Sequence, residues 1–216
     1  EAFIHLVRVD IAKGQIKTAI DKLEAKSNEE GGENSALVLE LGDVYRRIGS
    51  YANALTHYEK LYSKDQNSSD YLGRIVGILV AQGKAKKAIE TSQEFLKRNS
   101  RDGSAHFLLA DLYFNNKQVE QAFKQFNLAA KHSPNKAHVL NQFALAQKNS
   151  NDLQGAILSL EKAIAWNDAY FPAYMNLNDA YAEIGDTKKA LAMLDSYAEK
   201  YQGEDAILVL KGELYR

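Results

Sequence analysis

The chain of 216 residues contains no cysteine. This absence excludes disulfide bonds and thiolate metal sites, but it does not identify a cellular compartment. No apolar run approaches the length of about 20 residues that spans a bilayer, so we expect no membrane insertion by this segment. A basic excess is also missing, because 27 basic and 28 acidic residues give a net charge of −1. Nucleic-acid binders need a basic surface that releases counterions, so we expect no nucleic-acid partner.

The motifs of catalytic sites are missing as well. The five histidines are scattered and form no HExxH arrangement, and there is no glycine-rich phosphate cradle or nucleophile elbow. His132 and His138 straddle a predicted joint, where two solvated side chains are favoured over a metal site. Carboxylates stand beside lysines, as at Asp21 and Lys22, which is typical of solvated helix faces. We therefore predict that the chain is not an enzyme and holds no cofactor or metal.

What the sequence does contain is a repeat. Six alanines lie 35, 34, 34, 34 and 34 residues apart: Ala19, Ala54, Ala88, Ala122, Ala156 and Ala190. A period of about 34 residues is typical of helix hairpins, each of which buries its apolar face only by stacking on its neighbours. Alanine lets two helices approach closely without the cost of glycine to helix stability. We therefore predict an all-α fold, an α-solenoid of antiparallel helix pairs.

The residues around each alanine repeat too. Apolar, small and aromatic residues stand at fixed distances before and after the alanine. Around Ala54 these residues are Leu41, Gly42, Tyr45 and Tyr58. Around Ala122 they are Leu109, Ala110, Tyr113, Phe126, Ala129 and Pro134. This pattern resembles the tetratricopeptide repeat over nearly the whole chain, and the resemblance implies a right-handed superhelix. In register the repeats span 1–34, 35–68, 69–102, 103–136, 137–170 and 171–204, with 205–216 opening a seventh. We predict that they form a single array over residues 1–216.

Two repeats depart from the pattern. The third has Val76 where Gly or Ala is usual, with Leu79 and Ser92 in place of aromatic residues, and the sixth has Asn178 and Tyr197 in place of small residues. These departures predict looser or differently angled packing within those two repeats.

Turn residues agree with the register. Gly, Asn and Asp recur where the first helix of each repeat must end, as at Gly49, Gly83 and the pair Asn115 and Asn116, because they tolerate a left-handed backbone. The longest joint, residues 29–34, absorbs the extra residue of the first spacing, and we predict that it protrudes.

Both ends of the sequence lie inside predicted helices and carry apolar residues, namely Phe3, Ile4 and Val7 at one end and Leu208, Leu210 and Tyr215 at the other. A natural array normally ends in a polar capping helix. We interpret the sequence as a fragment of a longer array, bacterial from its preference for Lys over Arg, and from the cytoplasm or the cell envelope. Apolar ends of this kind would also favour self-association.

The aromatic residues at repeating places, such as Tyr45 and Phe126, are predicted to pack between helices. Trp166, the one tryptophan, lies at the end of a predicted helix. Two interpretations stay open for it, a packed joint between repeats and an exposed contact for a partner.

The family resemblance also implies a binding surface. In this family the first helices of the repeats line a concave groove, and recurring positions on them contact the ligand. By register those positions hold Leu39, Asp43, Arg46, Arg47, Arg74, Phe107, Asp111, Phe114, Asn141, Lys148, Met175 and Asp179. Apolar anchors mixed with both signs of charge suit an extended peptide or a partner helix.

One ligand of the family is not expected. Members that bind chaperone tails hold a C-terminal carboxylate with Lys and Asn, whereas this chain has Leu39 and Asp43 at those places. Asp43 and Asp70 would repel a carboxylate, so we do not expect the tail of a heat-shock chaperone.

The sequence therefore predicts a non-catalytic protein–protein interaction module that binds a peptide or a helix of a partner in its concave groove. Two alternatives stay open. One is a self-assembling scaffold, and the other is the regulatory or presenting arm of a larger enzyme or envelope export or sorting protein. The sequence does not identify the partner.

Overall fold

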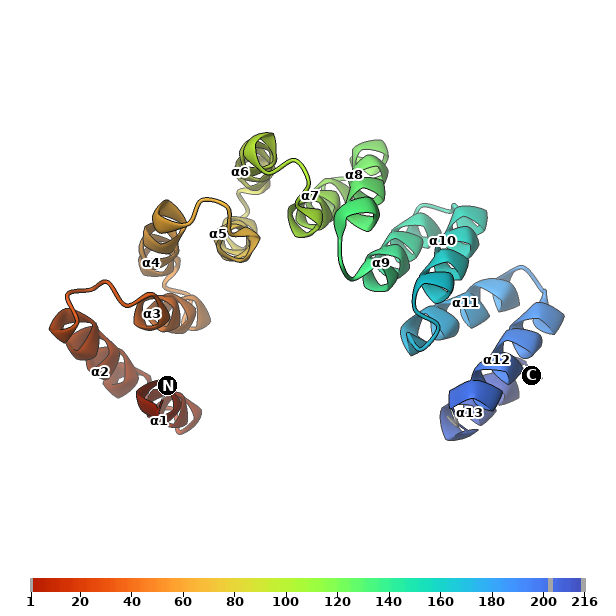
Figure 1. Cartoon of the computed structure of the whole chain (residues 1–216), viewed down its shortest axis with the longest axis horizontal. Helices are drawn as coiled ribbons and strands as arrows, with labels where there is room; N and C mark the ends of the chain where they lie inside the picture. The colour runs from red at the N-terminus through yellow and green to blue at the C-terminus, as the bar shows by residue number, and fades with distance from the viewer. Residues whose placement is uncertain (1, 202–203, 215–216) are drawn as a thin grey trace. The chain divides into compact units, whose positions relative to one another are not determined.

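The computed structural model describes residues 2–201 and 204–214, which form thirteen α-helices in sequence order (Figure 1). Consecutive helices pack as pairs, and this described part of the chain contains no strand. The fold is therefore all-α, as the repeat period predicts. We call the odd-numbered helices first helices and the even-numbered helices second helices.

The first helices are α1 (Ala2–Ala12), α3 (Ser35–Arg47), α5 (Ser69–Ala81), α7 (Gly103–Asn115), α9 (Lys136–Asn149), α11 (Phe171–Glu183) and α13 (Glu204–Leu214). The second helices are α2 (Ile16–Glu29), α4 (Tyr51–Lys64), α6 (Ala85–Arg98), α8 (Val119–His132), α10 (Leu153–Trp166) and α12 (Thr187–Tyr201).

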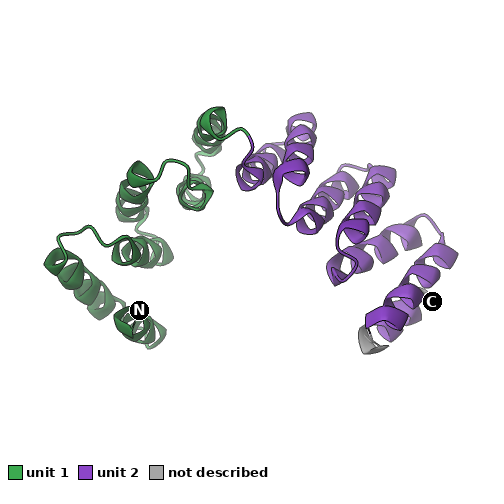
Figure 2. Ribbon diagram, viewed as in Figure 1, with its two compact units in different colours: residues 1–100 green, residues 101–216 purple. Residues whose placement is uncertain are grey.

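The chain divides into two compact units, which Figure 2 shows in different colours. Unit 1 comprises residues 1–100 and unit 2 comprises residues 101–216. We describe each unit by itself, and the single array over residues 1–216 stays a prediction. The division falls close to the predicted repeat boundary after residue 102.

The turn after each first helix follows the register of the repeat. Its left-handed residue is glycine in four repeats, at Gly14, Gly49, Gly83 and Gly185. At the equivalent place in the other two repeats, Lys117 and Asn151 take the same conformation, each with φ of 62°. In the fourth repeat the left-handed residue is thus Lys117 and not Asn116, where the sequence break was predicted. Packing of the repeat sets the backbone here and overrides residue preference.

The joint at residues 29–34 is held by the second helix of the next repeat. The Nζ atom of Lys60 in α4 donates a hydrogen bond to the carbonyl oxygen of Gly32 at 2.7 Å. At the end of the joint, the side-chain oxygen of Asn34 accepts a hydrogen bond from the backbone N–H of Ala36 at 3.0 Å. The joint therefore leads into a capped helix, α3.

The six repeat-defining alanines are all at most 1% exposed, which confirms their predicted place between helices. A second position, twelve residues before each alanine, holds Val7, Gly42, Val76, Ala110, Ala144 and Asn178. Helix pairs with Gly or Ala at this position pack more extensively than helix pairs with Val or Asn. The more extensively packed pairs are α3–α4, α7–α8 and α9–α10, and the less extensively packed pairs are α1–α2, α5–α6 and α11–α12. The looser packing predicted for the third and sixth repeats is thus confirmed, and the first repeat shares it.

Gly42 shows why the residue at this second position must be small. A Cβ atom built on Gly42 would lie 2.6 Å from Cε1 of Tyr58, a side chain of α4 that is fully buried. That separation is far shorter than a van der Waals contact, so α3 and α4 can approach this closely only at glycine.

Candidate partner-binding surfaces

In unit 1 the predicted contact residues lie on two neighbouring first helices. Leu39, Asp43, Arg46 and Arg47 are on α3, and Arg74 is on α5. Arg46 and Arg47 are exposed, whereas Leu39, Asp43 and Arg74 are half-buried. The structure thus brings Asp43 and the two arginines of α3 into one neighbourhood.

Asp43 joins three helices. Its carboxylate forms an ion pair with Arg74 of α5 and accepts a hydrogen bond from the hydroxyl of Tyr58 in α4 at 2.5 Å. Burial and this hydrogen bond raise the pKa of Tyr58. Because the carboxylate is already neutralised, Asp43 stabilises the stacking of repeats, and it presents little free negative charge to a ligand.

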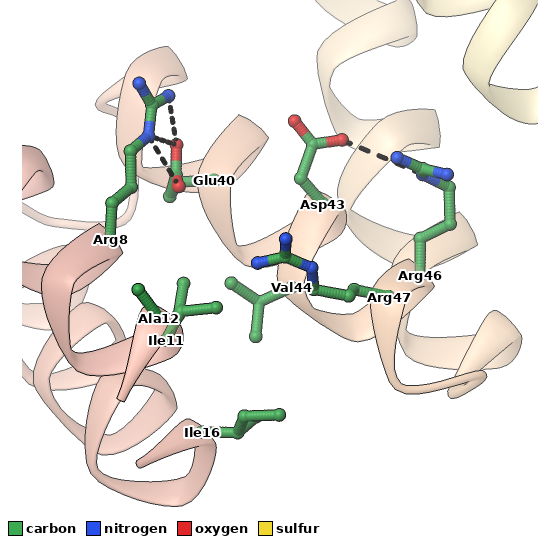
Figure 3. Close-up of a pocket in the computed structure, with 9 residues that line it drawn as sticks. All are labelled: Arg8, Ile11, Ala12, Ile16, Glu40, Asp43, Val44, Arg46 and Arg47. Carbon is green, nitrogen blue, oxygen red and sulfur yellow. Dashed lines mark hydrogen bonds and ion pairs between the residues drawn. The ribbon is translucent and has the colours of Figure 1, made fainter. Parts of the chain in front are cut away.

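A pocket of about 830 Å³ opens beside Asp43, between α1, the start of α2, and α3. Its lining residues, drawn in Figure 3, are Arg8, Ile11, Ala12, Ile16, Glu40, Asp43, Val44, Arg46 and Arg47. Four of them are apolar and come from all three helices. Pockets of about 300–1,000 Å³ accommodate small ligands or a few side chains.

The two carboxylates of this pocket are both neutralised. The Arg8 guanidinium donates to Glu40 through Nε at 3.0 Å and through Nη2 at 2.7 Å, a two-pronged pair between α1 and α3. The hydrogen bond to Glu40 raises the pKa of Arg8. The Glu40 side chain is only 10% exposed, so its charge would be costly without Arg8.

The two remaining cations of the pocket are weakly held. Nε of Arg46 lies 4.0 Å from Oδ1 of Asp43, the outer limit of an ion pair. Arg47 makes no ion pair or side-chain hydrogen bond with any residue that the structure describes. Figure 3 shows its guanidinium extending beside Val44 into the pocket, while Arg46 turns toward Asp43. The pocket therefore has two neutralised carboxylates and a surplus of positive charge.

Arg8 and Ile11 were not predicted because family positions were transferred only from the second repeat onward, and Glu40, although in the second repeat, was not among the transferred positions. A signal was present, since Arg8 precedes Asp43 by the same 35 residues that separate the first two repeat alanines. Arg8 thus occupies in the first repeat the place of Asp43 in the second. The ion pairs Arg8–Glu40 and Asp43–Arg74 link successive first helices at matching register positions, with their signs reversed.

In unit 2 the two predicted aromatic anchors belong largely to the core. Phe107 and Phe114 of α7 are both half-buried against the cluster around Phe126. The ring of Phe107 packs edge-on against that of Phe126, with ring centroids 5.9 Å apart, and lies 5.7 Å from the ring of His138. Along α7, Phe107 precedes Asp111 and Phe114 follows it.

Two predicted residues of α9 link this helix to α11. Asn141 is 2% exposed, and its side-chain oxygen accepts a hydrogen bond from Asn176 at 2.8 Å. Lys148 forms an ion pair with Glu183 at 3.0 Å. Asn141 is therefore covered in this structure, and Lys148 has its charge partly satisfied.

Asp111, Met175 and Asp179 remain open to a ligand. Met175 is 42% exposed and Asp179 is exposed. Asp111 is half-buried, and its carboxylate has no hydrogen-bonding or ionic partner within the residues described. Burial raises the pKa of Asp111 to about 6. Its place in the register matches that of Asp43, but the residue matching Arg74 is Gln142, which carries no charge to compensate it.

Trp166, at the end of α10, is 57% exposed. The Nζ atom of Lys136 at the start of α9 lies 3.9 Å from the centre of its ring, within reach of a cation–π interaction. A fully packed joint, one of the two interpretations open from the sequence, is therefore wrong. Its exposure as a partner contact stays a prediction.

The histidines do not gather around a common point. The ring of His132 stacks on that of His106 at 6.0 Å, and His138 contacts Phe107 and Tyr170. Across residues 2–201 and 204–214, no three His, Asp or Glu side chains converge as metal ligands would. In the same part of the chain, no helix has both the length and the apolar character needed to cross a bilayer.

Two family models match parts of the chain. One describes subunit 3 of the anaphase-promoting complex, or cyclosome, and matches residues 47–127. The other describes the tetratricopeptide repeat and matches residues 137–170. No curated protein is significantly similar in sequence.

Several solved structures share the fold. The MamA protein is 22% identical, with a TM-score of 0.59 over 79% of this chain and 93% of that one. A tetratricopeptide repeat protein from Parabacteroides merdae is 20% identical, with a TM-score of 0.61 over 99% and 84%. YrrB, a TPR protein with an unusual peptide-binding site, is 19% identical, with a TM-score of 0.53 over 87% and 97%. At these identities the likeness concerns the fold alone.

Proposed function

The chain is a tetratricopeptide-repeat protein, and we propose that it is a non-catalytic interaction module whose first helices bind a peptide or a helix of a partner protein. The fold itself favours a protein partner, because helical repeats present a succession of similar faces along which an extended segment makes recurring contacts.

The observation that carries the proposal is charge with no partner among the described residues, beside apolar surface on the first helices of both units. In unit 1, Arg47 stands next to the apolar residues of the pocket. In unit 2, Asp111 stands between Phe107 and Phe114 on α7. Charges that the protein leaves unpaired can orient a partner, while the apolar neighbours supply most of the binding energy.

The solved neighbours give additional support to binding of a peptide. YrrB has the same fold and a peptide-binding site. That site belongs to YrrB, and the low identity gives no correspondence of residues. The ligand of the present chain must therefore be found experimentally.

The proposal is tested by selecting peptides from a displayed random library on the full chain. Selected peptides are then measured by fluorescence polarisation against Arg47→Glu in unit 1 and Asp111→Lys in unit 2. We expect each peptide to bind at least about tenfold more weakly to one of these variants, a change of about 1.4 kcal/mol.

Matched controls place the same charge changes on second helices. Lys87→Glu on α6 belongs to unit 1 and Glu199→Lys on α12 belongs to unit 2, and both side chains are exposed. We expect these variants to keep the affinity of the wild type. Peptides that respond only to the second-helix variants would contradict the proposal, as would the recovery of no binding peptide.

A second candidate function is self-assembly, because α1 and α13 carry exposed apolar side chains. Leu6 and Val9 of α1 are 63% and 46% exposed, and Leu208 and Val209 of α13 are 63% and 62% exposed. Sedimentation velocity over a range of concentrations tests this candidate. Association that disappears in Leu6→Lys with Leu208→Lys would favour self-assembly, and a monomer at all concentrations would exclude it.

A further inference from the structure

We propose that the pocket between α1 and α3 binds an acidic side chain together with an adjacent apolar side chain of the partner. The inference rests on the proposed function and deepens it by naming the chemistry of the bound segment. The partner would carry Asp or Glu next to a residue such as Leu within an internal stretch of its chain, with Arg46 and Arg47 contacting the carboxylate.

The positive charge of the pocket favours an acidic ligand. Glu40 is neutralised by Arg8, and Asp43 is neutralised by Arg74, which lies outside the pocket. Arg47 has no partner within the described part of the chain, whereas Arg46 approaches Asp43 at 4.0 Å and also interacts with the hydroxyl of Tyr58. An arriving carboxylate therefore meets the available guanidinium of Arg47, with the loosely paired Arg46 beside it, and both side chains can form charge-assisted hydrogen bonds.

This arrangement changes the expected electrostatic effect of Asp43 on an acidic ligand. On sequence alone its carboxylate would repel an acidic ligand. In the structure its oxygen already accepts the hydrogen bond of Tyr58 and pairs with Arg74. The repulsion is therefore largely cancelled at the place where the ligand would lie.

The second argument is the apolar surface beside the arginines. Ile11, Ala12 and Ile16 from α1 and α2 face Val44 of α3 around the pocket (Figure 3). A purely ionic contact on an exposed surface contributes little binding energy. Burial of an apolar side chain contributes more, so affinity requires both an acidic and an apolar residue in the ligand.

Arg46 and Arg47 also stabilise helix α3, and the experiment must distinguish this structural role from binding of a ligand. Both lie in the last turn of α3, where positive charge stabilises the helix dipole. Loss of that role would lower the stability of the protein and would not depend on the peptide offered. A second variant, Ala12→Phe, avoids it, because Ala12 is exposed at the pocket and contributes no charge.

The test uses three short peptides with blocked ends, so that no terminal carboxylate or amine is present. They differ only at a central motif, which is Leu-Glu-Glu-Leu, Leu-Gln-Gln-Leu or Leu-Lys-Lys-Leu. Fluorescence polarisation measures each against the full chain, Arg47→Glu, Ala12→Phe and the control Lys87→Glu. Thermal melts confirm that all four proteins are folded.

We expect the acidic peptide to bind the wild type at least about tenfold more tightly than the amide peptide. That preference should be lost in Arg47→Glu, binding should be lost in Ala12→Phe, and both should be kept in Lys87→Glu. Equal binding of the acidic and amide peptides would overturn the inference, as would equal weakening by Lys87→Glu or no binding of the acidic peptide.

These outcomes are distinct from failure of the proposed function. If the acidic preference is absent but peptides selected from the random library still respond to Ala12→Phe or Asp111→Lys, the first helices bind a partner of other chemistry. If no selected peptide responds to any first-helix variant, the proposed function fails together with the inference.

Discussion

At the scale of single residues, Asp111 differs from the equivalent aspartates of other repeats in its burial and in the pairing of its charge. Asp43, Asp111 and Asp179 share one register position on three first helices. Asp43 is paired with Arg74, Asp179 is exposed, and Asp111 is half-buried with no partner among the residues described. The same side chain therefore has a structural role in one repeat and is available to a ligand in another.

The raised pKa of Asp111, about 6, has a consequence for stability. In the unfolded chain the carboxyl ionises near pH 4, so between about pH 4 and 6 the folded protein holds a proton that the unfolded chain has released. Ionisation in the folded state thus costs free energy at neutral pH. We expect Asp111→Asn to raise the free energy of unfolding by about 1–3 kcal/mol at pH 7.5 and by much less at pH 4.5.

Urea denaturation at the two pH values measures this difference, and Asp179→Asn is the matched control. Because Asp179 is exposed, its replacement should change stability little at either pH. If Asp111→Asn does not raise the free energy of unfolding at pH 7.5, or raises it equally at both pH values, the described environment of Asp111 is contradicted.

The residue type alone could not have separated these three aspartates. What distinguishes them is the residue about 31 positions later on the next first helix, which is Arg74 after Asp43 and Gln142 after Asp111. Within its own repeat, each of the three matches a groove position of the family, and this match does not reveal whether its charge is paired. A comparison of neighbouring repeats would have found the candidate partner, while the contact itself depends on side-chain geometry.

At the scale of helices, ion pairs between successive first helices suggest a stabilising substitution. Gln142 of α9 takes the place relative to Asp111 that Arg74 takes relative to Asp43. We expect Gln142→Arg to pair with Asp111, to lower its pKa and to stabilise the protein at neutral pH. A double-mutant cycle with Asp111→Asn should give a coupling of about 0.5–2 kcal/mol. A coupling near zero would mean that α7 and α9 are not stacked as α3 and α5 are.

The packing within helix pairs depends on one small residue. Ala110, at the close approach of α7 and α8, is fully buried, whereas the equivalent Val76 lies in a less extensively packed pair. We expect Ala110→Val to push α7 and α8 apart and to lower the free energy of unfolding by about 1–3 kcal/mol through overpacking.

The same exchange at exposed Ala165 of α10 provides the control, since it should cost only the helix propensity of about 0.5 kcal/mol. Urea denaturation compares the two variants. Equal effects at Ala110 and Ala165 would contradict the assignment of Ala110 to the helix–helix contact.

These elements were the most predictable part of the structure. The alanine period located every helix pair, and the departures at Val76 and Asn178 predicted two of the three pairs that pack less closely, whereas the loose packing of α1–α2 was not predicted. The turn at Lys117 was not predicted from residue type. Lys117 adopts a left-handed backbone because of its place in the repeat, although lysine does not favour that conformation. The exposure of Trp166 was not predictable, since it depends on how the end of α10 lies against the start of α9. Tyr215, assigned from sequence to an apolar end, lies outside the described residues.

At the scale of the whole molecule, the sequence predicts the class of function better than the site. The repeat and its family favour the proposed interaction module, while the contact surface depends on which charges neighbouring helices neutralise. Arg8 and Glu40 show this, since their pairing leaves Arg47 in the unit 1 pocket without a partner among the residues that the structure describes. The central claim is accordingly that first helices, and not second helices, bind the partner.

The measurement that tests this claim most directly is hydrogen–deuterium exchange of the full chain with and without a saturating selected peptide. The account predicts slower exchange in the first helices of the unit that binds, such as α1 and α3 or α7 and α9, with second helices little changed. Protection confined to second helices, or no protection at saturation, would contradict it.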